Sequence, residues 1–140
     1  MILLFSFLFF PDSAQDLIQQ DPRNNSAWNL RWFACHKGTK DPLSLEQCIS
    51  EGDFAIQKGA KLDPFNESPW RYLVALLREQ NGICDNNNLY HEFEQKANNL
   101  RSVLTDAGRN PDTCACLTSA RIDLLEMMGD PKALEMVSIV

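Results

Sequence analysis

Asp21-Pro22-Arg23-Asn24-Asn25-Ser26-Ala27-Trp28 is the stretch that decides the fold of this chain, because much of it recurs. It returns as Asp63-Pro64-Phe65-Asn66-Glu67-Ser68-Pro69-Trp70, with Asp, Pro, Asn, Ser and Trp each 42 positions later. Self-similarity at a fixed period of this size indicates stacked structural repeats. Repeat arrays present extended surfaces that bind other molecules, so the sequence predicts a scaffold or a subunit rather than a self-contained catalyst.

The rest of the chain reads as helices separated by clear stop signals. Asp-Pro pairs end helices because the residue before a proline avoids the α region, and glycines mark other ends. No segment shows the alternating pattern of a strand. The expected helices cover residues 13–20, 25–36, 44–61, 68–81, 89–107, 113–128 and 131–140. We therefore predict an all-α fold, with antiparallel helix hairpins stacked as an α-α superhelix that resembles a TPR solenoid.

Capping residues support these helix starts. Ser44 and Gln47 have the spacing of a capping box, and Asn25 or Ser26 can cap the helix that follows the first Asp-Pro pair. We expect Ser68 to cap the helix after the second pair, with Pro69 at its first position, where a missing N–H costs nothing.

The helices group into units that follow the repeat. We expect units at about residues 21–62, 63–109 and 110–140, with the segment 1–12 outside the repeat. The predicted helix pairs are 25–36 with 44–61, 68–81 with 89–107, and 113–128 with 131–140. In this scheme the helix at 13–20 has no partner.

Five residues in or directly after the repeated stretch are expected to hold the repeat together: Trp28, Arg31, Trp32, Ser68 and Trp70. A large aromatic in the first turn can pack against a neighbouring helix pair. Arg31 lies three residues after Trp28, on the same side of the helix, and can reach a partner or a loop carbonyl. The Asn and Ser residues of the two repeated stretches have two possible roles, as helix caps or as contacts to a second protein.

Composition is that of a soluble globular protein. The 140 residues are 44% hydrophobic and 23% charged, with a net charge of −6. No basic cluster is present, which argues against nucleic acid as the main partner. Five cysteines form an odd number without a C-x-x-C pair, so we expect reduced thiols and a cytoplasmic location. The sequence predicts no metal site in this chain.

The first twelve residues are strongly apolar but too short to span a bilayer as a helix. Three interpretations remain: a cleaved signal peptide, a short buried helix or strand, or a chain whose proper upstream sequence is missing. The repeat favours the third, and no stable membrane insertion is expected.

The pattern Asn-x-x-x-Trp-x-x-Arg at the start of alternate helices resembles the repeat of protein prenyltransferase alpha subunits. It is present as Asn24 to Arg31 and, without the Arg, from Asn66 to Trp70. The sequence of these repeats is most similar to that of the alpha subunit shared by protein farnesyltransferase and geranylgeranyltransferase type I. The resemblance is strong over residues 15–80, weak over 81–140 and absent over 1–12.

This resemblance implies a fold and a function. The family's alpha subunit is a crescent of helical hairpins that wraps a beta subunit, and the beta subunit holds the catalytic zinc. The holoenzyme, which also uses magnesium, joins farnesyl or geranylgeranyl from an isoprenoid diphosphate to the cysteine of a C-terminal CaaX motif in a protein substrate. In this reading the chain is an alpha-subunit fragment that forms a heterodimer and contributes no cofactor of its own.

The resemblance also implies which residues face the beta subunit: Arg23, Asn24, Asn25, Asn66 and Glu67. In the family a lysine that approaches the diphosphate lies in an earlier repeat, in a motif like Lys-Asn-x-x-x-Trp. This chain has no such motif, and Lys37 and Lys40 follow a helix rather than begin one. We therefore predict no catalytic residue in the chain. The alternative function is a free-standing TPR-like adaptor that binds peptides and takes part in no enzyme.

Overall fold

The computed structural model describes residues 13–36, 41, 43–80, 87–127, 129–130 and 132–137. The segment 1–12, Lys37 and Lys40, about which predictions were made, lie outside these residues. The described residues form helices and turns without a strand, which confirms the predicted all-α fold class.

Every predicted helix has a counterpart in the structure. Residues 13–20 form the first described helix. The following elements are α2 (Asn25–Cys35), α3 (Leu45–Ala55), the π-helix η1 (Ile56–Ala60), α4 (Glu67–Gln80), α5 (Asn87–Asp106), the 3-10 helix η2 (Pro111–Thr113), α6 (Ala115–Met127) and α7 (Lys132–Val137).

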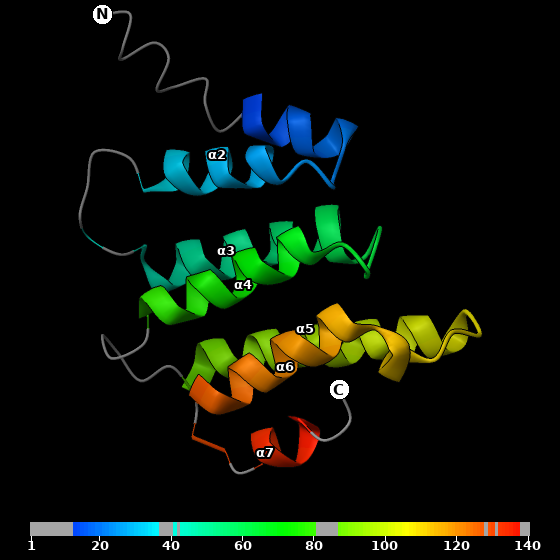
Figure 1. The fold of residues 1–140 in the computed structure, drawn as a ribbon. Helices are drawn as coiled ribbons and strands as arrows, with labels where there is room; N and C mark the ends of the chain where they lie inside the picture. Colours follow the sequence, from blue (N-terminus) through cyan, green and yellow to red (C-terminus); the bar gives the residue numbers. More distant parts are fainter. Residues whose placement is uncertain are drawn as a thin grey trace, which may run out of the picture.

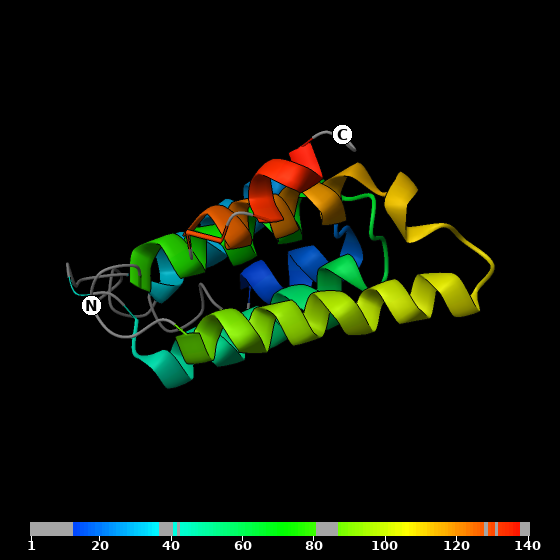
Figure 2. The ribbon, with the colours of Figure 1, turned by 90° about the horizontal axis from the view of Figure 1, so that it is seen from below.

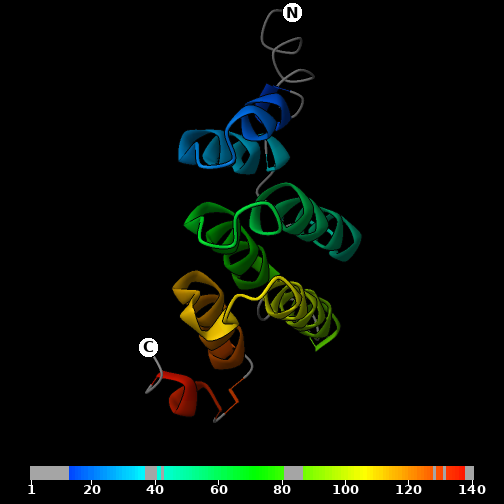
Figure 3. The same ribbon diagram turned by 90° about the vertical axis from the view of Figure 1, so that its right-hand side faces the viewer.

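The helices stack in order along one axis, with the helix at 13–20 near one end and α7 at the other (Figure 1). Two further views show two layers (Figures 2 and 3). One layer contains α2, α4 and α6, and the other contains the helix at 13–20, α3 and α5. Helices of the same layer contact one another in sequence, α2 with α4, α4 with α6, and α3 with α5.

Helix pairing differs from the prediction for the first two pairs. The predicted pairs placed α2 with α3 and α4 with α5, but α3 packs most extensively against α4, and α5 packs more closely against α6 than against α4. The helix at 13–20 was predicted to lack a partner, yet it lies beside α2, and Ala14 and Ile18 are fully buried. Only the pair of α6 with α7 packs as expected. The two Asp-Pro turns of the repeated phrase, at Asp21 and Asp63, therefore lie inside the hairpins, where they carry the chain from one layer to the other.

The caps of two helices also differ from the prediction. Asn24, not Asn25 or Ser26, caps α2, because its side chain accepts a hydrogen bond from the backbone N–H of Ala27. In α4 the helix begins at Glu67, and Ser68 donates its backbone N–H to the side chain of Asn66 instead of capping the helix itself. The cap thus moves from Ser68 to Asn66, and the helix starts two residues earlier than the predicted cap implied. The capping box of Ser44 and Gln47 is confirmed.

The predicted helix at 44–61 is α-helical only to Ala55 and continues as the π-helix η1. A π-turn widens the helix locally and shifts the residues that follow. Gly59 lies in this turn, and a Cβ atom added there would be 2.6 Å from Cβ of Pro69 and 2.8 Å from Cζ2 of Trp28. The absence of a side chain at this position therefore lets η1 approach the start of α4 and the indole of α2.

The core lies between the two layers. Each helix of the first layer contributes large side chains that are completely or almost completely buried, among them Trp28 in α2, Leu76 in α4 and Leu117 in α6. From the other layer, α5 buries Phe93, Ala97, Leu100 and Leu104. The apolar contact is thus continuous along the stack, as expected where one hairpin cannot bury its apolar face alone.

Candidate functional site

The two tryptophans of the repeated phrase have equivalent environments. The indole Nε1–H of Trp28 donates a hydrogen bond to the carbonyl oxygen of Pro22 at 2.8 Å, and that of Trp70 donates to the carbonyl oxygen of Pro64 at 2.9 Å. The two side chains are only 2% and 3% exposed. Each ring therefore fills the core while its one polar group is satisfied by the Asp-Pro turn six residues earlier.

A second set of hydrogen bonds joins each repeat to the previous one. The amide of Asn66 donates through Nδ2 to the same carbonyl of Pro22 at 2.5 Å. In the next repeat the thiol of Cys114 donates to the carbonyl of Pro64 at 3.1 Å. Cys114 directly precedes α6 and has the extended backbone conformation that Asn24 has before α2. Cys114 thus takes the position of the capping asparagine in the third repeat.

Arg31 is held inside the stack rather than presented to a partner. Its Nε and Nη2 bind Oε2 and Oε1 of Glu51 in α3 at 2.7 and 3.0 Å, and its Cζ lies 3.5 Å from the centroid of the Phe54 ring. The Tyr72 hydroxyl in α4 donates to the same Glu51 at 2.7 Å. One carboxylate therefore links α2, α3 and α4. A planar, bidentate guanidinium pair of this kind is among the stronger charged contacts in proteins.

The ends of α2 and α4 are joined beside this network. The ring of Trp32 contacts that of Tyr72 edge to face and stacks on His36 at 4.2 Å between centroids. Both ring nitrogens of His36 face acceptors at 2.7 Å, the carbonyl of Trp32 and a carboxylate oxygen of Glu79. Trp32 thus packs between α2 and α4, but its side chain is less buried than that of Trp28.

Burial raises the pKa values of two side chains near Glu51, those of Cys35 and Tyr72. Burial, with the nearby Glu51 charge, raises the pKa of the Cys35 thiol to about 11. Burial, again with Glu51 as the next cause, raises the pKa of the Tyr72 hydroxyl. Both groups are therefore neutral at physiological pH, so neither is an activated nucleophile.

The five predicted interface residues lie at the starts of α2 and α4, but their side chains differ in availability. Arg23 is exposed and forms an ion pair with Asp63 at 2.5 Å. Asn24 caps its helix, and Asn66, only 4% exposed, is used twice within the stack. Asn25 and Glu67 are exposed at corresponding positions.

Glu67 pairs with Arg71 at 2.5 Å, and the side chain of Asn25 lies 3.3 Å from the Ser68 hydroxyl, which donates to it. Ser68, a predicted structural residue, is therefore part of this contact between α2 and α4 rather than a cap.

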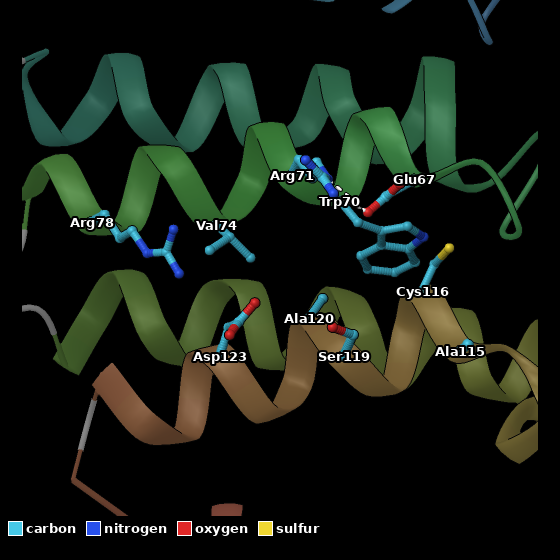
Figure 4. Close-up of a pocket in the computed structure, with 10 residues that line it drawn as sticks. All are labelled: Glu67, Trp70, Arg71, Val74, Arg78, Ala115, Cys116, Ser119, Ala120 and Asp123. Carbon is cyan, nitrogen blue, oxygen red and sulfur yellow. Dashed lines mark hydrogen bonds and ion pairs between the residues drawn. The ribbon is translucent and has the colours of Figure 1, made fainter. Parts of the chain in front are cut away.

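Two grooves lie on the face formed by α2, α4 and α6, and their lining residues correspond by repeat position. The first groove, of about 290 Å³, lies between α2 and α4 and is lined by Asn25, Trp28, Asn29, Trp32, Ser68, Arg71, Tyr72 and Ala75. The second, of about 540 Å³, lies between α4 and α6 (Figure 4). Its lining is Glu67, Trp70, Arg71, Val74, Arg78, Ala115, Cys116, Ser119, Ala120 and Asp123.

The four α2 residues of the first groove correspond to α4 residues of the second groove 42 positions later, and its four α4 residues correspond to α6 residues 48 positions later. The face formed by α2, α4 and α6 thus carries two grooves built from equivalent repeat positions. These grooves could not be predicted from the sequence, because the spacing of 48 residues between α4 and α6 differs from that of 42 residues between α2 and α4, and the repeated residues are lost in the third repeat.

The described residues hold no group of three or more His, Cys, Asp or Glu side chains arranged to bind a metal ion. Among them, no helix is long and apolar enough to cross a bilayer. What this arrangement offers is a rigid stack with a grooved polar and aromatic face, which suits binding of a second macromolecule.

The fold and the repeated helix starts define an all-α array of tandem helical repeats. A family model described as "Protein prenyltransferase alpha subunit repeat" matches residues 12–38, which include the whole first phrase. The chain is thus similar to the prenyltransferase alpha subunits, and the resemblance predicted from the sequence is confirmed.

Three relatives carry the same printed description, "Protein farnesyltransferase/geranylgeranyltransferase type-1 subunit alpha". The one from Dictyostelium discoideum is 39% identical over 64 residues, which is 46% of this chain and 20% of the relative. The one from Arabidopsis thaliana is 41% identical over 71 residues, 49% of this chain and 21% of the relative. The one from Pisum sativum is 34% identical over 73 residues, 51% and 21% respectively. The matched region thus spans about a fifth of each relative. No solved structure is significantly similar to the chain.

Proposed function

We propose that this chain acts as alpha-subunit repeats of a heterodimeric protein prenyltransferase and braces a beta subunit. The supporting observation is the family repeat over residues 12–38, together with relatives whose descriptions name the farnesyltransferase and geranylgeranyltransferase type-1 alpha subunit. The chain works in the cytoplasm in this proposal, and the assembled enzyme transfers farnesyl or geranylgeranyl to the cysteine of CaaX proteins.

The catalytic zinc and the magnesium belong to the holoenzyme in this proposal, and the zinc is held by the beta subunit. The described residues of this chain do not form a zinc ligand set, so no catalytic step is assigned to them. The chain's own contribution is to hold its repeats in a fixed register, through the Trp-to-Pro and inter-repeat hydrogen bonds, against the partner.

The proposed interface includes Arg23, Asn24, Asn25, Asn66 and Glu67 at the starts of α2 and α4. Their internal contacts refine how each residue acts. Asn24 and Asn66 position the helix starts, whereas the exposed Asn25 and Glu67 are available to touch the beta subunit.

Co-expression tests the proposal. The chain is produced with the farnesyltransferase beta subunit, and separately with the geranylgeranyltransferase type I beta subunit, of its own organism. We expect a 1:1 complex on size-exclusion chromatography with light scattering, and we expect Asn25→Asp with Glu67→Lys to weaken it. A stable, cooperatively melting monomer that binds neither beta subunit would support the adaptor function instead.

A further inference from the structure

The second groove is larger than the first because two aromatic rings are missing from it. At the position of Trp32 in the first groove the second has Val74, and at the position of Tyr72 it has Ala120. The first groove is filled where Trp32 and Tyr72 meet edge to face at 5.5 Å. The space that these rings take between α2 and α4 is open between α4 and α6, and the floor left there is apolar.

Charge is also left without a partner at this groove. Arg71 is paired with Glu67 at one rim. The exposed Arg78 forms no ion pair or hydrogen bond with any described residue, and its side chain extends into the gap between α4 and α6, toward Val74 (Figure 4). An unpaired guanidinium beside an apolar recess favours a carboxylate on whatever occupies the recess.

We propose that the α4–α6 groove receives a segment of the beta subunit that inserts one large apolar side chain over Val74 and Ala120 and pairs a carboxylate with Arg78. This inference rests on the proposed function and deepens it, because it assigns the main anchoring site to the second groove rather than to the helix starts. The inserted side chain takes the volume that Trp32 and Tyr72 fill one repeat earlier. A buried apolar anchor flanked by a charged contact has the composition of an interface hot spot.

The test fills the groove from within. Ala120→Tyr restores the residue type of the first groove, and it is expected to weaken binding to the co-expressed beta subunit about tenfold or more. Arg78→Glu is expected to weaken binding about tenfold, more at low salt than at high salt. The matched charge reversal Lys58→Glu, at an exposed residue of η1 that lines neither groove, is expected to have no effect.

A second groove-filling variant and the labelling of Cys116 test the proposal independently of whether Ala120→Tyr folds. If Ala120→Tyr lowers the melting temperature, Ser119→Trp replaces it, because Ser119 is an exposed rim residue of the same groove. In addition, Cys116 lines the groove, so its labelling by a maleimide is expected to slow at least about tenfold in the complex. Wild-type affinity of both groove-filling variants, or equal labelling of Cys116 in free and bound chains, overturns the proposal while the proposed function stands. No binding of the wild-type chain to either beta subunit overturns both.

Discussion

Asn66 donates its side-chain amide to the carbonyl oxygen of Pro22, 44 residues earlier, at 2.5 Å. Through its other amide atom, Oδ1, the same side chain accepts the backbone N–H of Ser68. One residue thus caps its own helix and ties its repeat to the previous one. The carbonyl of Pro22 also accepts from Trp28, so the Asp-Pro turn is a junction of two repeats.

Asn66→Ala removes both functions of this side chain, whereas Asn24→Ala removes only a helix cap. We expect Asn24→Ala to cost about 1 kcal/mol of the free energy of unfolding, and Asn66→Ala about 2 kcal/mol or more. Urea unfolding monitored by circular dichroism measures both. Asn66→Asp is the informative control, because it keeps the cap acceptor but loses the donor to Pro22. Equal stability of Asn66→Asp and the parent would show that the inter-repeat bond contributes nothing.

Trp28→Ala and Trp70→Ala test the packing of the two equivalent rings. Each change removes a buried indole and leaves a cavity, and we expect each to cost about 3–5 kcal/mol. Equilibrium unfolding in urea gives the values. The partly exposed Trp32 serves as the comparison, with a smaller expected loss for Trp32→Ala. A loss below about 1 kcal/mol for Trp28 or Trp70 would refute its place in the core.

Glu51→Gln leaves the guanidinium of Arg31 buried without its counter-charge. Removing one member of a buried ion pair typically costs about 3–5 kcal/mol, and we expect a loss near the lower end, because the amide can still accept from Tyr72. The double variant Arg31→Met with Glu51→Met should recover much of this loss, since it removes both charges. A double-mutant cycle with Arg31→Met and Glu51→Met as the single variants, measured by chemical unfolding, gives the interaction energy of the pair. Purely additive losses would contradict a direct pairing of the two side chains.

The raised pKa values of Cys35 and Tyr72 predict how stability depends on pH. In each case the folded chain favours the neutral group, so the stabilisation is fully present below the unfolded-state pKa and is lost as the pH rises. For Cys35 this window runs from about 9, its usual value, to about 11 in the fold. We expect the urea midpoint to fall over this range, and Cys35→Ala with Tyr72→Phe to flatten the decline. Parallel pH profiles of parent and double variant would contradict this cause.

Gly59→Ala places a methyl group into the contact between η1, Pro69 and Trp28. With neighbouring carbons at 2.6 and 2.8 Å, overpacking is expected to cost about 1–3 kcal/mol. Thermal unfolding compares it with Gly108→Ala. At Gly108 no atom lies within 4 Å of an added Cβ, and only the left-handed backbone, with φ of 76°, opposes the change. An unchanged or raised melting temperature for Gly59→Ala would show that η1 does not approach the helix start as described.

The helix positions follow from local signals, which is why the sequence predicts them well. Asp-Pro stops and the capping box at Ser44 act within a few residues of the helix they define, and Trp28 and Trp70 each lie in the first turn of their own helix. The cap of α2 was misplaced by one residue or more because Asn24, Asn25 and Ser26 are all good caps, and only the folded backbone selects among them.

The parts that could not be predicted depend on contacts distant in sequence. α3 packs more extensively against α4, which follows it, than against α2, which precedes it, and no local signal distinguishes these two neighbours. Cys114 has no capping propensity that would mark it, yet the carbonyl of Pro64 gives its thiol a partner 50 residues away. Likewise, Glu51 gained its role only when α2 and α4 brought Arg31 and Tyr72 to it from both sides.

The repeat ladder itself is tested most directly by hydrogen exchange at the three indole N–H groups, measured by NMR on the chain or on its complex. The structure predicts that Trp28 and Trp70 exchange slowly and at similar rates, because both protons are held by proline carbonyls in the core, and that the indole proton of Trp32 exchanges much faster. Rapid exchange at either Trp28 or Trp70, at the rate of Trp32, would contradict the equivalence of the two repeats.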